Sequence, residues 1–173
     1  MCVADATPHP SGSVPSGAVK VDLPGHGFWF ETDDAWVIPR HWADPSVWQD
    51  HGVMLEEQSI GATVSARALH TQGVLSTDGM LKLLLEQQWG VVPSNVVQAD
   101  TGALVWAAGT FVAANAPGGA IREWFVTDGA PVATDGRLRI ANFGLMGAPD
   151  ALQRATAACE AMVRSVRFTH GHR

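Results

Sequence analysis

The sequence has no tyrosine, only two cysteines and few charges, since Asp, Glu, Lys and Arg make up 16% of its 173 residues. Cys2 and Cys159 are too few for the disulfide framework of a small secreted protein. No apolar run approaches the roughly 20 residues of a membrane span, and the core of a signal peptide is missing as well. The net charge is −6. We therefore expect no nucleic-acid partner and no direct binding to an anionic membrane surface.

The motifs that usually carry catalysis are missing too. The sequence contains no Gly-x-Ser-x-Gly elbow, no phosphate-binding glycine loop and no Rossmann fingerprint. The carboxylate doublets Asp33–Asp34 and Glu56–Glu57 each place neighbouring side chains on opposite faces of a strand, so neither forms a catalytic pair. Cys159 lies on the apolar side of a predicted helix, where burial keeps a thiol unreactive. We predict no catalytic residue, no cofactor and no enzymatic activity.

A metal site is an alternative with weaker support. The Cys-x-x-Cys and His-Glu-x-x-His patterns are absent. His41 and His51 share one segment with Asp44 and Asp50, which leaves open a surface site of histidine and carboxylate ligands. The histidines within 170–172 lie close to the C-terminus and are expected to bind metals only adventitiously. We predict no metal site and keep a histidine–carboxylate metal-binding protein or enzyme as an alternative.

The chain divides by composition into a leader, a domain and a tail. Residues 1–24 are rich in Pro, Ser and Gly, a composition typical of a flexible segment. Residues 25–168 form a single domain, and residues 169–173 are a C-terminal tail. Cys2 followed by this leader also matches the start of a mature bacterial lipoprotein, so Cys2 is a candidate lipid anchor. The alternative is a leader that is merely disordered.

The last third of the chain carries the clearest pattern. A strand is predicted over 137–143, followed by a glycine-rich break and then a helix that begins at Pro149–Asp150 and ends near Phe168. Proline suits the first helical position, where its missing N–H has no partner to lose. The apolar residues of this helix recur on one face of a 3.6-residue period; they are Leu152, Ala155, Cys159, Met162, Val163 and Val166. One apolar face needs a cover, and the preceding strands supply it.

Strands and helices alternate in blocks along the rest of the chain. β-prone stretches separated by turn residues predict strands; they fall at 27–31, 54–58, 62–69, 104–113 and 121–127. A second helix is predicted to begin at 76–78 and to end at Gly90. Strands with segregated helices give an α+β domain, here an antiparallel β-sheet of five to seven strands flanked by helices.

Tryptophan is the most unusual feature of the composition. Four of the seven lie within twenty residues; they are Trp29, Trp36, Trp42 and Trp48. Such a group exceeds what a few short strands normally bury, so we predict an exposed or half-exposed surface that binds a partner. Packing in the core and anchoring of loops is the alternative interpretation.

The order of these elements resembles the Mog1/PsbP-like superfamily. An aspartate-rich turn leads into Trp36, and the final helix closes with the run 163–168, Val-Arg-Ser-Val-Arg-Phe. The resemblance covers about residues 27–168, although Asp34-Ala35-Trp36 stands where Pro-Asp-Gly-Trp is common and 41–52 form a Trp-rich insertion. It implies an α/β/α sandwich without catalytic activity. Members include accessory subunits, bacterial envelope lipoproteins and chaperones of secreted effectors.

The function predicted from these observations is a non-catalytic bacterial binding or accessory module in the cell envelope or periplasm. It would engage a protein partner, or an apolar small ligand, through the Trp-rich surface, and it would meet a membrane only through a lipid anchor. Two alternatives stay open, a cytoplasmic chaperone-like adaptor for secreted effectors and the metal-binding protein or enzyme described above.

Overall fold

The computed structural model describes residues 17–71, 78–79, 81–82, 92–112, 119–132 and 136–169. Its strands form two antiparallel sheets, one of six strands in the order β3-β4-β8-β7-β6-β5 and one of three in the order β1-β2-β9. The large sheet consists of β3 (Val53–Glu57), β4 (Ala62–Thr71), β5 (Ser94–Asp100), β6 (Val105–Val112), β7 (Ala120–Thr127) and β8 (Leu138–Gly147). The small sheet consists of β1 (Val19–Leu23), β2 (Phe28–Thr32) and β9 (Arg167–Phe168). The predicted α+β class is confirmed, although the strands divide between two sheets.

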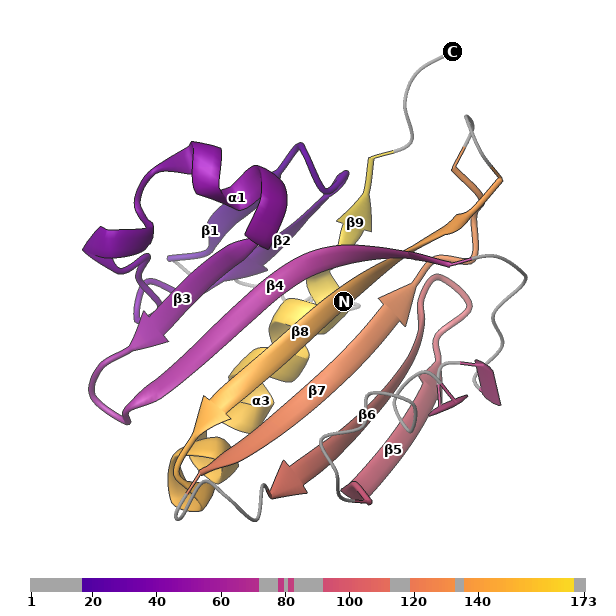
Figure 1. Cartoon of the computed structure of the whole chain (residues 1–173). Helices are drawn as coiled ribbons and strands as arrows, with labels where there is room; N and C mark the ends of the chain where they lie inside the picture. Colours follow the sequence, from indigo (N-terminus) through magenta and orange to yellow (C-terminus); the bar gives the residue numbers. More distant parts are fainter. Residues whose placement is uncertain are drawn as a thin grey trace, which may run out of the picture.

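Helix α3 (Pro149–Ser165) packs across one face of the large sheet (Figure 1). Pro149 stands at its first turn, as predicted. All six residues of the predicted apolar face are buried in the core; they are Leu152, Ala155, Cys159, Met162, Val163 and Val166. The amphipathic pattern therefore gave both the helix and the face that it buries.

The small sheet lies on the same side of the large sheet as α3 (Figure 1), and it shares one hydrophobic core with them. Phe143 of β8 joins the two sheets, because its ring centroid lies 5.1 Å from that of Phe30 and 6.3 Å from that of Phe28. All three rings are fully buried. Phe168 of β9 packs on the edge of this group, 6.1 Å from Phe28.

The predicted leader is too long. Val19–Leu23 forms β1 and pairs antiparallel with β2 from Val19–Thr32 to Leu23–Phe28, so residues 19–23 belong to the domain. Val21 and Leu23 point into the core while Lys20 and Asp22 lie outside. Residues 1–16, which include Cys2, lie outside the described residues, and so do residues 170–173.

The face of the large sheet opposite α3 carries a second, smaller core. Ala107, Phe111, Phe125 and Ile140 are buried there, and Leu81 packs against them. Residues 78–79 and 81–82 are helical, within the helix predicted from residue 76; the rest of that predicted helix lies outside the described residues. A helical segment therefore contacts this second face, as the predicted sheet with helices on it requires.

Cys159 is fully buried in the middle of α3. Burial, with a smaller effect of the neighbouring Glu160, strongly raises the pKa of the Cys159 thiol above its ordinary value. The folded protein therefore keeps this thiol protonated at a pH at which the unfolded chain ionises it. Because the unfolded state then binds fewer protons than the folded state, the free energy of unfolding must fall as the pH rises.

We expect this fall to begin near the ordinary thiol pKa of about 8.5 and to reach about 1.4 kcal/mol per pH unit above it. The measurement is urea unfolding between neutral and alkaline pH, on the parent chain and on Cys159→Ala, both with Cys2→Ser. The difference between the two isolates Cys159, because lysines titrate equally in both. Parallel pH profiles would contradict the buried, protonated thiol.

Candidate functional site

The tryptophans predicted to bind a partner do not form one exposed surface. Trp36 is 5% exposed and belongs to the hydrophobic core, so its predicted surface location is wrong. Trp42 ends the 3₁₀ helix η1 (Arg40–Trp42), and its indole N–H donates to Gly52 O at 3.1 Å. Trp48 lies in α1 (Pro45–His51) and donates to Trp42 O at 2.8 Å. Both side chains are half-buried; the Trp42 bond ties η1 to the residue before β3, and the Trp48 bond ties α1 to η1.

Trp29 is the remaining member of that group. It is half-buried on β2, and the Nζ atom of Lys20 lies 4.7 Å from its ring centroid. This is an ordinary cation–π pair between neighbouring strands, worth about 0.5–1 kcal/mol at an exposed site. Partner binding by Trp29, Trp42 and Trp48 stays a prediction, but the rings of Trp42 and Trp48 also have a structural role that Trp29 lacks.

The alternative of a histidine–carboxylate metal site has no support in the described part of the chain. No group of three His, Cys, Asp or Glu side chains there could hold a metal ion. Asp44 instead caps α1, because its carboxylate accepts from the backbone N–H of Ser46 at 2.9 Å, and this hydrogen bond lowers the pKa of Asp44. His41 and His51 each pack beside Trp42, with ring centroids 6.3 and 6.4 Å away.

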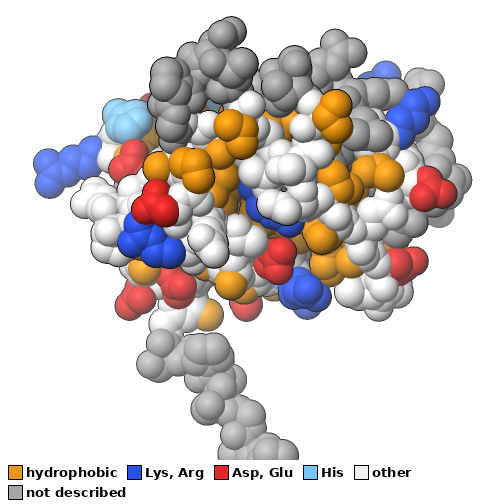
Figure 2. Space-filling view, turned by 90° about the horizontal axis from the view of Figure 1, so that it is seen from below, with side chains coloured by type: hydrophobic (Ala, Val, Ile, Leu, Met, Phe, Trp, Pro, Cys, Tyr) orange, Lys and Arg blue, Asp and Glu red, His pale blue; other side chains and the backbone are white. Residues whose placement is uncertain are grey.

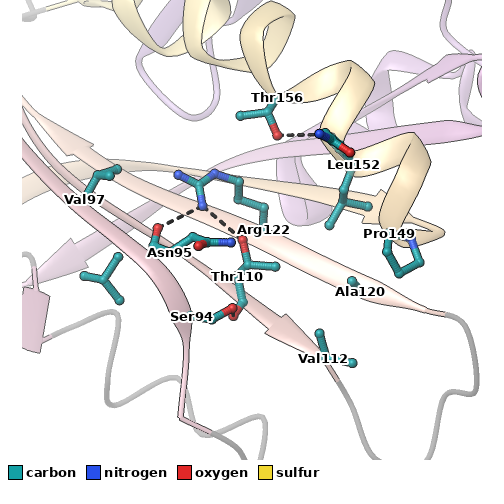
Figure 3. A pocket seen from close by; sticks show the side chains of 12 residues that line it. Ser94, Asn95, Val97, Thr110, Val112, Ala120, Arg122, Pro149, Leu152 and Thr156 are labelled. Carbon is teal, nitrogen blue, oxygen red and sulfur yellow. Dashed lines mark hydrogen bonds between the residues drawn. The ribbon is translucent and has the colours of Figure 1, made fainter.

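A groove lies elsewhere in the described part, at the end of the molecule where β5 and β7 begin, β6 ends and α3 begins (Figure 1). The groove has a volume of about 660 Å³. One wall is the N-terminal half of α3, with Pro149 and Leu152, and the other is formed by the strands, with Val97, Val112 and Ala120 (Figure 3). A concave, mainly apolar site of this size falls in the range of ligand pockets.

Arg122 of β7 is the one basic residue among the described residues that line this groove. Its guanidinium projects into the space between the strands and α3 (Figure 3), and only 8% of its side chain is exposed. Nη1 donates to Asn95 O at 3.1 Å and to Thr110 Oγ1 at 3.0 Å, while the guanidinium carbon lies 5.2 Å from the Trp124 ring centroid. Burial lowers the pKa of Arg122, yet arginine stays charged at neutral pH.

The edge of the Arg122 guanidinium formed by Nε and Nη2 has, among the described residues, only one acidic group near it. Nη2 lies 4.0 Å from Glu160 Oε1, at the limit of an ion pair, and that carboxylate is 36% exposed. Nε is buried and has no hydrogen-bond partner in the part of the chain that the structure describes. A buried cation whose hydrogen bonds go to two neutral oxygens is costly, so an anion bound beside it would be stabilised.

An irregularity in the backbone of β5 places a carbonyl oxygen next to Arg122. The pairing of β5 with β6 shifts register between Ser94 and Val97, and Asn95 has a φ of 50°. Asparagine accepts this left-handed conformation more readily than most residues. The bulge lets the Asn95 carbonyl meet the guanidinium.

Exposed hydrophobic residues gather around the same groove. Of the six exposed large hydrophobic residues among the described ones, four lie just before β5, on it or at the end of β6; they are Val92, Val96, Val97 and Val112, and we call them the valine rim. They range from 41% to 87% exposed. Figure 2 shows hydrophobic side chains gathered across the middle of the face at this end of the molecule. Such a patch beside a groove is typical of a binding surface.

Comparisons with solved structures establish the fold. Cyanobacterial PsbP from Synechocystis matches with a TM-score of 0.53 and 13% identity, over 93% of this chain and 98% of that one. The Ran-binding protein Mog1p from Saccharomyces cerevisiae matches with a TM-score of 0.55 and 6% identity, over 88% and 95%. LpqN of Mycobacterium tuberculosis, involved in cell envelope biogenesis, matches with a TM-score of 0.50 and 13% identity, over 91% and 87%. The chain has the Mog1/PsbP-like fold.

The predicted resemblance is thus confirmed at the level of the Mog1/PsbP-like fold. No protein-family model matches the sequence, and no curated protein does either. At 6–13% identity these three structures show the fold alone. The functional residues therefore depend on the geometry of this chain itself.

Proposed function

We propose that this domain is a non-catalytic binding module that engages a protein partner through the valine rim. The observation that carries the proposal is the concentration of exposed valines beside the Arg122 groove, on a surface without a cover among the described residues. One of the similar structures, Mog1p, is named as Ran-binding, which is consistent with a binding role.

The position of β5 supports a protein as the partner. β5 is the last strand in the order of the large sheet, so one of its edges carries no strand of the described part. An extended segment of another protein can add to such an edge through backbone hydrogen bonds, while apolar pockets beside it select side chains. Val96 and Val97 lie on this strand, and Val112 lies across from it at the end of β6.

For the location of the protein we propose the bacterial cell envelope, with Cys2 as the candidate lipid anchor. The description of LpqN as involved in cell envelope biogenesis supports this proposal. None of the described helices is long and apolar enough to cross a membrane. A cytoplasmic adaptor is the alternative, and fractionation of cells after metabolic labelling with a fatty-acid analogue would separate the two, because only a lipidated Cys2 carries the label into the membrane fraction.

The valine rim is tested by single substitutions to aspartate. We expect Val96→Asp and Val112→Asp each to weaken capture of the partner by about tenfold or more, because a charge in an apolar contact loses the buried area and adds desolvation. Val19→Asp is the matched control, since Val19 is 45% exposed on β1, in the small sheet and outside the groove. The measurement is quantitative co-purification from cells after in vivo cross-linking, with the unfolding midpoint of each variant recorded.

Equal capture by all three variants would overturn the valine rim as the binding surface. If capture instead survives in the rim variants and is lost in Trp29→Ala, the surface predicted from the tryptophans is the binding surface. Trp29 suits this comparison because its described contact is a cation–π pair with Lys20. The indoles of Trp42 and Trp48, by contrast, donate hydrogen bonds that hold the segment around α1 together.

A further inference from the structure

In the groove, whose walls include Val97 and Val112 of the valine rim, we propose a binding site for the carboxylate of an aliphatic small molecule, of the chemical class of medium- and long-chain fatty acids. Arg122 receives the carboxylate, and the apolar walls cover the hydrocarbon chain. The site goes beyond the protein-binding function proposed above and does not depend on it.

The charge of the groove selects an anion. The Arg122 side chain is more than nine-tenths buried; among the described residues its Nε has no hydrogen-bond partner, and Nη2 makes only the 4.0 Å approach to Glu160. Nε and Nη2 are the two donors of one edge of the guanidinium, and this edge matches the two oxygens of a carboxylate. Nη1, on the other side, is already fixed by Asn95 O and Thr110 Oγ1. The cation is thus held by two neutral oxygens on one side, while the edge formed by the buried Nε and Nη2 makes no hydrogen bond to the described residues.

The number of basic groups favours a carboxylate over a phosphate. In the described part of the groove lining, Arg122 is the single basic residue, and the other polar side chains are hydroxyls and amides. A singly charged, planar anion is balanced by one guanidinium, whereas a phosphate carries more charge and is usually held by several donors. The chain as a whole has a net charge of −6, so no general basic field attracts anions to this face.

The walls fit the rest of a fatty acid. Val97, Val112, Ala120 and Leu152 supply apolar surface on both sides of the groove, and Pro149 closes one end (Figure 3). The volume of about 660 Å³ lies within the usual 300–1,000 Å³ of small-molecule sites. Burial of each methylene contributes about 0.8 kcal/mol, so affinity is expected to rise with chain length while Arg122 determines the orientation.

The test is isothermal titration of the purified full chain with decanoate, kept below its micelle concentration, and with decanol as the uncharged probe. We expect decanoate to bind at one site and decanol to bind at least about tenfold more weakly, because only the carboxylate pairs with Arg122. Equal binding of the two probes would overturn the proposal. The absence of decanoate binding would overturn it as well.

Two variants locate the site without removing Arg122, which also holds Asn95 in place. Val97→Glu puts a carboxylate on the groove wall and should weaken decanoate binding by about tenfold or more through like-charge repulsion. Val19→Glu is its control, because Val19 and Val97 are 45% and 43% exposed. Glu160→Gln removes the competing carboxylate near Nη2 and should tighten decanoate binding by about two- to fivefold. Identical affinities in the parent chain and these three variants would exclude the Arg122 groove.

Discussion

Gly52→Ala is expected to lower the free energy of unfolding by about 3 kcal/mol or more, or to prevent folding. Gly52 has φ 78° and ψ −171°, a backbone conformation essentially restricted to glycine. A Cβ atom at this position would collide with the carbonyl oxygen of Ala66 and would lie 2.7 Å from the Cβ atom of Arg67. Both belong to β4, the neighbour of β3, so the strand next to Gly52 would have to move away.

Gly61→Ala is the matched control for this substitution. Gly61 has a similar φ of 68°, but no heavy atom lies within 4 Å of the position of its Cβ atom. Its replacement should cost only about 1–2 kcal/mol, the intrinsic cost of a left-handed residue with a side chain. Urea unfolding of both variants measures the difference. Equal losses would show that backbone strain alone, without the contact to β4, accounts for the role of Gly52.

Phe143→Ala should lower the free energy of unfolding by about 3–5 kcal/mol, the usual cost of deleting a buried aromatic ring. Phe143 is fully buried and contacts both Phe28 and Phe30, so the cavity would open between the two sheets. Because the walls of this cavity belong to different sheets, loss of the ring should also loosen the small sheet, which hydrogen exchange at β1 and β2 would detect.

Phe143→Leu keeps most of the volume and should cost less than about 1.5 kcal/mol. Phe168→Ala is a second comparison, since Phe168 is half-buried at the edge of the same group. The expected order of stability is therefore Phe143→Leu first, Phe168→Ala next and Phe143→Ala last, in chemical unfolding. A loss below about 1 kcal/mol for Phe143→Ala would contradict its role as the joint between the sheets.

Much of the fold could be predicted because its patterns are local. The apolar face of α3 shows a helical period over seventeen residues, and the strands β3, β4, β6 and β7 lie between turn residues. β1 was missed although Val19, Val21 and Leu23 alternate with Lys20 and Asp22. This short alternation lies between Pro15, Gly17 and Pro24. The high content of Pro, Ser and Gly therefore predicted a flexible leader, although the alternation is typical of a strand.

The candidate site could not be predicted in the same way. Arg122 had one local signal, because it shares its strand face with Trp124 and Val126, and a charge at an inward position calls for a partner. Its meaning depends on the bulge of β5, on the register of β6 with β7 and on the position of α3. None of these relations is local in sequence. The binding surface predicted from the tryptophans, by contrast, depended only on their number. Trp36 is part of the core, and Trp42 and Trp48 make hydrogen bonds that hold the segment around α1 together.

The pairing of β9 with β2 has a consequence for synthesis of the chain. Phe28 faces Phe168 across this ladder, and Trp29 faces Arg167, so the small sheet unites segments from nearly opposite ends of the sequence. The ribosome releases β2 long before β9. Until β9 emerges, the edge of β2 that pairs with β9 lacks this partner strand. A nascent domain in this state is open to mispairing. The small sheet is therefore complete only after the two residues of β9 have been synthesised.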